Sequence, residues 1–68
     1  MAYRGAPYYE ALKHKYLAEI KEAEAVLDTY FTKSVGIGEH SDLLVEFDKW
    51  VSKLADAKEK LQVLEEML

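Results

Sequence analysis

Two histidines and their neighbours are the residues of this sequence whose types could support chemistry. His14 follows Glu10 by four residues, which places both side chains on one side of a helix, one turn apart. An imidazole and a carboxylate in that position could bind a metal ion. Di-metal sites in helical bundles, however, use Glu-x-x-His together with further glutamates that project inward. Here the spacing is Glu-x-x-x-His, it occurs once, and both residues fall on the polar side of the helix, so we expect no metal site.

The second histidine lies in the run Glu39-His40-Ser41-Asp42, where an acid, an imidazole and a hydroxyl are adjacent. A hydrolytic triad is defined by geometry in space, and adjacency in sequence does not supply that geometry. The sequence also lacks a G-x-S-x-G nucleophile elbow. We therefore interpret Ser41 as the N-cap of a helix. Asp42 then lies in the first turn, where the helix dipole favours a negative charge.

Gly36 and Gly38 precede this run, and glycine-rich loops can bind phosphate groups. A Walker loop also needs a lysine after its glycines, whereas acidic residues follow here. The two glycines are therefore predicted to end a helix and form a turn. The chain has no cysteine, which excludes disulfides and thiolate metal sites. The sequence predicts no catalytic, metal-binding or cofactor-binding residue, and we expect that the protein is not an enzyme.

The strongest pattern in the sequence is a heptad seam of apolar residues that runs from residue 43 to residue 68. Its steps alternate between four and three residues without interruption, as in a coiled coil, where two helices supercoil around each other. No proline or glycine interrupts residues 39–68. The seam therefore predicts a helix from about residue 41 that packs against a partner helix. Its members are Leu43, Phe47, Trp50, Leu54, Ala57, Leu61, Leu64 and Leu68.

A second helical pattern runs from Pro7 to about Lys33. Proline suits the first helical position, because its missing N–H has no partner there. The apolar positions of this helix again follow helical spacing, and they are Tyr9, Leu12, Tyr16, Ile20, Ala23, Leu27 and Tyr30. Two helices of similar length (about 7–33 and 41–68) with a short connection predict an all-α antiparallel hairpin. Residues 1–6 are expected to form a flexible arm, and residues 7–68 a single domain.

The two seams also predict how the helices are aligned. If the connection is centred near residue 37, Ala23 falls opposite Trp50, and Ala57 falls opposite Tyr16. Each large aromatic then meets an alanine, which keeps the volume of each core layer constant. The other pairs that this register predicts are Leu27 with Phe47, Ile20 with Leu54, Leu12 with Leu61, and Tyr9 with Leu64.

Further apolar residues lie beside the two seams and would stay exposed in an isolated hairpin. These candidates for an interface are Tyr8, Leu17, Val26, Phe31, Leu44 and Val51. A soluble monomer rarely exposes so much apolar surface, and a chain of 68 residues has only a small core. We therefore expect a homodimer in which two hairpins form a four-helix bundle. A foreign protein that covers the same residues is the alternative.

The charges are distributed unevenly along the chain, whose net charge is −4. Residues 22–48 hold seven acidic residues and one lysine, whereas residues 1–21 and 49–60 each carry a net charge of +2. No basic stripe could follow a phosphate backbone, so we expect no binding to nucleic acid. No apolar run is long enough to cross a membrane, which favours a cytoplasmic protein. The acidic part either attracts a basic partner or is a solvated surface.

One resemblance rests on the run Tyr30-Phe31 and Val35-Gly36-Ile37-Gly38-Glu39-His40-Ser41-Asp42-Leu43, which precedes a helix rich in lysine and alanine. Together with the pattern Tyr-x-x-Leu-Lys-x-Lys-Tyr-x-x-Glu-Ile at residues 9–20, it resembles small helical proteins encoded by tailed phages of marine cyanobacteria. The resemblance covers most of the chain but carries no activity and no site residue. It implies expression in the cytoplasm of the host cell, with presence in the virion as an alternative.

These observations lead to one expected function and one alternative. We expect a non-enzymatic helical hairpin that acts by self-association and protein–protein contact, as a phage-encoded accessory or host-interacting protein. A small structural component of the virion is the alternative. Both functions need only a helical surface, so the sequence does not separate them.

Overall fold

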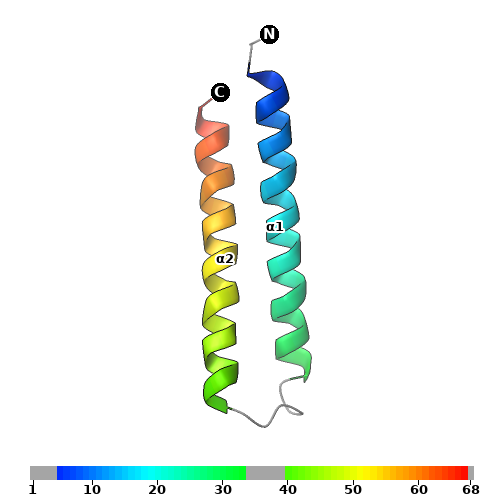
Figure 1. Cartoon of the computed structure of the whole chain (residues 1–68), viewed down its shortest axis with the longest axis vertical. Coiled ribbons are helices and arrows are strands. Elements are labelled where there is room, and N and C mark those ends of the chain that lie inside the picture. The colour runs from blue at the N-terminus through cyan, green and yellow to red at the C-terminus, as the bar shows by residue number, and fades with distance from the viewer. Residues whose placement is uncertain (1–4, 34–39, 68) are drawn as a thin grey trace.

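The chain folds into two antiparallel helices, as the sequence predicts. The computed structural model describes residues 5–33 and 40–67, without the side chains of Lys33, His40 and Ser41. Helices α1 (Ala6–Lys33) and α2 (His40–Glu66) pack against each other and form a helical hairpin (Figure 1). Ala6 and Glu66 lie at what we call the terminal end of the hairpin; Lys33 and His40 lie at the opposite, connection end.

The helix boundaries differ from the predicted ones by one or two residues. Both helices begin one residue earlier than expected, and α2 ends at Glu66. The predicted turn at Gly36 and Gly38, the cap formed by the Ser41 side chain, and the last seam residue, Leu68, lie outside the described residues.

Helix α1 begins with a proline in its first turn. The amide of Tyr9 donates a hydrogen bond to the carbonyl of Gly5 at 2.8 Å, which is the first bond of the helical ladder. Pro7 is therefore the second residue of the helix rather than the first. In this first turn the N–H groups have no partner within the helix, so a residue without an N–H leaves the ladder intact.

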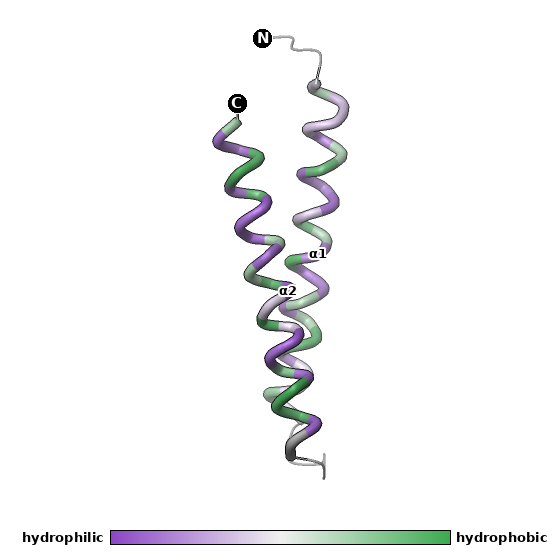
Figure 2. Tube along the Cα trace, turned by 60° about the vertical axis from the view of Figure 1, so that its left-hand side comes forward, coloured by the Kyte–Doolittle hydropathy of each residue, from purple (hydrophilic) through white to green (hydrophobic). Residues whose placement is uncertain are grey.

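The core of the hairpin is thin. Among the described residues, the buried apolar side chains are Ile20, Ala23 and Leu27 of α1 and Ala57 of α2. Every described member of the predicted α2 seam is buried or half-buried, and among the other described side chains of α2 only Glu46 reaches that level. Hydrophobic and hydrophilic residues alternate in short bands along both helices (Figure 2). The heptad seam therefore defines the packed face of α2, as predicted.

The side chains that meet across the core are offset from the predicted register. That register places Tyr30 opposite residue 44, but its ring packs edge-on against Phe47, with 5.5 Å between ring centroids. Its hydroxyl also donates a hydrogen bond to Glu46 at 3.5 Å. Side chains on a helix lean toward the N-terminus of that helix. In an antiparallel pair, this lean shifts the contacts of both helices in the same direction. A side chain of α1 therefore contacts a residue of α2 about two positions further along the chain than the residue that lies opposite its own backbone.

The buried alanines allow a test of this packing. We expect Ala23→Leu to destabilise the hairpin by about 1–3 kcal/mol, because the larger side chain must force the helices apart. Ala25→Leu is the matched control, since Ala25 is exposed on the same helix. The measurement is urea unfolding followed by circular dichroism at one protein concentration. Equal stability of the two variants would contradict close packing of α2 over Ala23.

Candidate interaction surface

A two-helix hairpin has two sides, which flank the core seam, and the structure distinguishes them. Residues just before a core position in α1, such as Leu12 and Glu19, line pockets together with Lys53 and Lys60 of α2, which also precede core positions. We call this side 1. Residues that directly follow core positions lie on the other flank of each helix and form side 2. Its apolar members are Leu17, Phe31, Leu44 and Val51.

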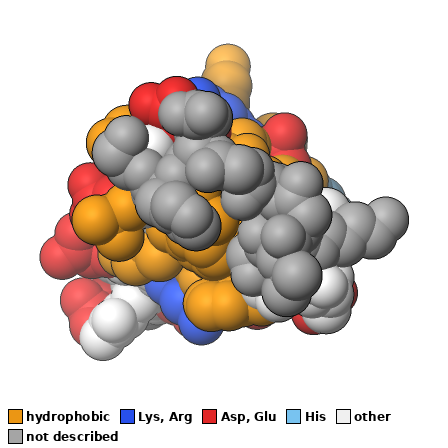
Figure 3. All heavy atoms as spheres, turned by 90° about the horizontal axis from the view of Figure 1, so that it is seen from below, with side chains coloured by type: hydrophobic (Ala, Val, Ile, Leu, Met, Phe, Trp, Pro, Cys, Tyr) orange, Lys and Arg blue, Asp and Glu red, His pale blue; other side chains and the backbone are white. Residues whose placement is uncertain are grey.

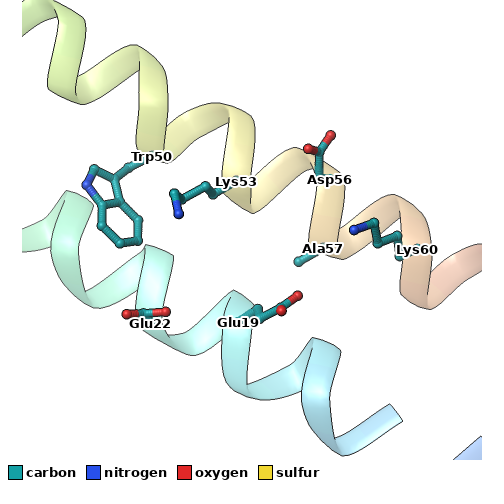
Figure 4. Close-up of a pocket in the computed structure, with 7 residues that line it drawn as sticks. All are labelled: Glu19, Glu22, Trp50, Lys53, Asp56, Ala57 and Lys60. Atoms are coloured by element: carbon teal, nitrogen blue, oxygen red, sulfur yellow. The ribbon is translucent and has the colours of Figure 1, made fainter. Parts of the chain in front are cut away.

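The middle of side 1 holds a charged pocket of 210 Å³. Glu19 and Glu22 of α1 and Lys53 and Lys60 of α2 line it, together with Trp50, Asp56 and Ala57 (Figure 4). Acidic residues of one helix thus lie across from basic residues of the other. Exposed charges contribute little stability, but opposite charges on facing helices favour this alignment over others. This arrangement was not predicted from the sequence, although the charges directly before each core position indicate it.

Trp50 forms the aromatic wall of this pocket. The Nζ of Lys53 lies 5.0 Å from the centre of the Trp50 ring, and the Nζ of Lys49 lies 5.7 Å from it. These are cation–π distances, and tryptophan is the best partner for such contacts. The ring extends from α2 toward α1, beside Glu22 (Figure 4). The two lysines and the ring thus cover the half-buried edge of the core on side 1.

Toward the terminal end, side 1 becomes apolar. A pocket of 290 Å³ is lined there by Leu12, Tyr16, Val63, Leu64 and Met67, with Glu59 and Lys60 at its edge. Leu12 was expected in the core opposite Leu61, but it is 37% exposed and lines this pocket instead. The half-buried Lys13 takes the position seven residues before Ile20, which displaces Leu12 to the flank of the seam.

Side 2 is apolar near the connection end. Phe31 and Leu44 expose 70% and 71% of their surface, and Val51 exposes half. The ring of Phe31 packs against Phe47 with 4.9 Å between centroids, so its inner edge is held by the core while its outer face stays uncovered. Seen from this end, hydrophobic side chains reach the surface with acidic side chains beside them (Figure 3).

The six predicted interface residues do not all lie on one side of the hairpin. Leu17, Phe31, Leu44 and Val51 lie on side 2, whereas Tyr8 and Val26 precede core positions of α1 and belong to side 1. The reason is helical geometry: Tyr8, Leu17 and Val26 are nine residues apart, and nine residues make two and a half turns. Val26 is also half-buried, while the other five are exposed.

The pair formed by His14 and Glu10 of α1 lies on the exposed surface. His14 Nε2 is 3.9 Å from Glu10 Oε1, and both side chains are exposed. Within residues 5–33 and 40–67, no group of three or more His, Cys, Asp or Glu side chains could hold a metal ion. The side chain of His40 lies outside the described part of the chain. In the same described ranges, neither helix is long and apolar enough to cross a membrane.

Comparisons with protein-family models, with curated proteins and with solved structures give no match for the chain. The residues of sides 1 and 2 are therefore the basis for inferring its function.

The aromatic cluster at the connection end gives a second test. We expect Tyr30→Phe to cost at most about 0.5 kcal/mol of stability, because the hydroxyl bond to Glu46 is long at 3.5 Å. Tyr30→Ala should cost about 2 kcal/mol, because it removes the half-buried ring that packs on Phe47. Thermal unfolding of the two variants measures the difference. A larger loss in Tyr30→Phe would show that the hydroxyl, and not the ring, holds this cluster.

Proposed function

We propose that the protein works by self-association and protein–protein contact and not by catalysis. One observation carries the proposal: the described residues include four buried apolar side chains and nine large apolar side chains that are exposed. Folding a chain this short around so small a core is marginal, and association is a common way to make up the deficit. The exposed apolar surface is thus best explained as surface that another protein covers.

Side 2 is the face that we assign to self-association, in a homodimer that forms a four-helix bundle. Its apolar residues recur at heptad spacing: Leu17 and Phe31 are two heptads apart, and Leu44 and Val51 are one heptad apart. Residues with this spacing lie along one flank of a helix and can meet a second pair of helices. A bundle of two hairpins would bury the side-2 flanks of α1 and α2 from both copies in one shared core.

Side 1 supports a second contact, with a foreign protein. Its apolar pocket, lined by Leu12, Val63 and Met67 among others, lies on the flank that a dimer through side 2 leaves open. Together with the resemblance to phage-encoded proteins, this pocket favours an accessory protein that binds a host protein in the bacterial cytoplasm. A small structural component of the virion is the alternative, in which the bound protein belongs to the particle.

A matched pair of variants tests self-association through side 2. Val51 and Val63 lie on the same helix and are both 50% exposed, but on different sides of the hairpin. We expect Val51→Glu to shift the protein from dimer to monomer, because it places a charge without a partner in the apolar contact. Val63→Glu should remain dimeric. The measurement is solution mass by light scattering on a sizing column at two protein concentrations.

Three outcomes of this experiment would contradict the proposal in different ways. A wild-type monomer at both concentrations would exclude self-association and leave both sides for foreign partners. A dimer that Val63→Glu dissociates and Val51→Glu does not would move the interface to side 1. A dimer that neither variant affects would place the interface outside both surfaces.

A further inference from the structure

We infer that the second copy covers side 2 with its connection end at the opposite end of the bundle. The inference rests on the proposed self-association and specifies its geometry. The two-fold axis of this dimer passes near Glu24 and Val51, so that α1 packs on α1 of the second copy and α2 on α2. Both neighbouring pairs are then antiparallel, as in other helical bundles.

The order of residues on α1 is the first argument for this arrangement. From Leu17 to Phe31, side 2 of the helix presents Leu17, Lys21, Glu24, Asp28 and Phe31, and this order is symmetric about Glu24. If two copies of α1 cross antiparallel at Glu24, each Leu17 meets the Phe31 of the other copy. Each Lys21 meets the Asp28 of the other copy. The arrangement thus forms two apolar contacts and two contacts between opposite charges.

The central glutamates are compatible with this crossing. The Nζ of Lys21 lies 4.0 Å from Glu24 Oε1 within the same helix, so a positive charge accompanies each glutamate near the axis. Lys21 and Glu24 are well exposed. Their mutual contact is therefore weak, and both can reorient when a second copy approaches.

Helix α2 has the same centre of symmetry. Contacts across the hairpin, such as Tyr30 with Glu46, place Val51 at about the level of Glu24. The two-fold axis then brings Val51 against Val51 of the second copy. On either side of it, Leu44 faces Lys58 of the second copy, and Asp48 faces Ala55. The aliphatic stem of Lys58 can cover the leucine, while its ammonium reaches toward Asp48, which lies one turn away.

The opposite orientation, with both connection ends together, is opposed by charge. It would stack α1 of one copy on α2 of the other and place Asp28 against Asp48 in two symmetric positions. It would also unite the two acidic segments, residues 22–48, each with seven acidic residues and one lysine. Like charges repel when they are held close together. Charge complementarity therefore selects the arrangement in which each acidic half lies over the more basic half of the other copy.

Single cysteines introduced into this cysteine-free chain test the axis directly. A disulfide requires Cα atoms within about 7 Å, so Val51→Cys should crosslink the dimer under mild oxidation. Ser52→Cys is the control, because Ser52 is exposed and, as the next residue of the helix after Val51, lies further from the two-fold axis. A mixture of Asp28→Cys and Asp48→Cys chains should give no mixed disulfide. Efficient mixed crosslinking, or equal crosslinking by Val51→Cys and Ser52→Cys, would overturn the inferred arrangement.

A charge exchange tests the Lys21–Asp28 contact independently of disulfide geometry. Lys21→Asp and Asp28→Lys should each weaken the dimer about tenfold, because each creates two like-charge contacts. The double variant restores opposite charges and should return to within about threefold of the wild type. Lys15→Asp, an exposed control on side 1, should leave the dissociation constant unchanged. Sedimentation equilibrium gives these constants, and circular dichroism checks that each variant is folded.

The two proposals can fail separately in these experiments. If the wild type is a dimer but the double variant is no tighter than the single ones, the inferred geometry is wrong while self-association stands. If the wild type is a monomer, self-association itself is wrong, and a foreign protein is the remaining occupant of side 2.

Discussion

The packing of one stripe of α1 against one stripe of α2 is the contact on which the rest of the structure depends. Each helix has only one neighbour, so most of its circumference stays outside the core. The closest packing occurs where small side chains allow it, at Ala23 and Ala57, which are 0% and 2% exposed. Larger members of the α2 seam, such as Trp50 and Leu61, are half-buried. A core of this kind aligns two helices but leaves much of their apolar surface uncovered.

The apolar surface beside the core is covered to different extents on the two sides of the hairpin. On side 1, lysine stems, the Trp50 ring and carboxylates cover the middle of the seam, and only the terminal end stays apolar. On side 2, the apolar residues cluster toward the connection end, beside Asp28 and Asp48. An apolar patch with an acidic surround favours a partner that offers apolar side chains flanked by positive charge. The half of side 2 nearer the terminal end, with Leu17, Lys21 and Lys58, meets this description when a second copy of the chain offers it.

The sequence was sufficient to predict the two helices and the packed face of α2. A 3.5-residue period of apolar residues can be recognised in the sequence alone, and it decides which face of the helix packs against its neighbour. The contact of Tyr30 with Phe47 was not predicted, because the backbone register ignores the direction in which side chains lean. Tyr8 and Val26 were grouped with Leu17 as interface candidates but lie on the other side of the hairpin, because the flank that a residue occupies depends on its angle around the helix. The apolar pocket at Val63 and Met67 depends on both helices at once, so neither helical pattern alone reveals it. The dimer remains a prediction.

Helix α1 begins, at Ala6, at the same end of the hairpin at which α2 ends, at Glu66 (Figure 1). In a bundle whose hairpins point in opposite directions, these two helix ends of one copy would lie at the opposite pole from those of the other copy. Helix α1 has 28 residues and is therefore about 42 Å long at 1.5 Å per residue. These two pairs of helix ends would therefore be held apart by a rigid rod of roughly this length. The assembly would act as a molecular spacer, whose length is set by the number of helical turns.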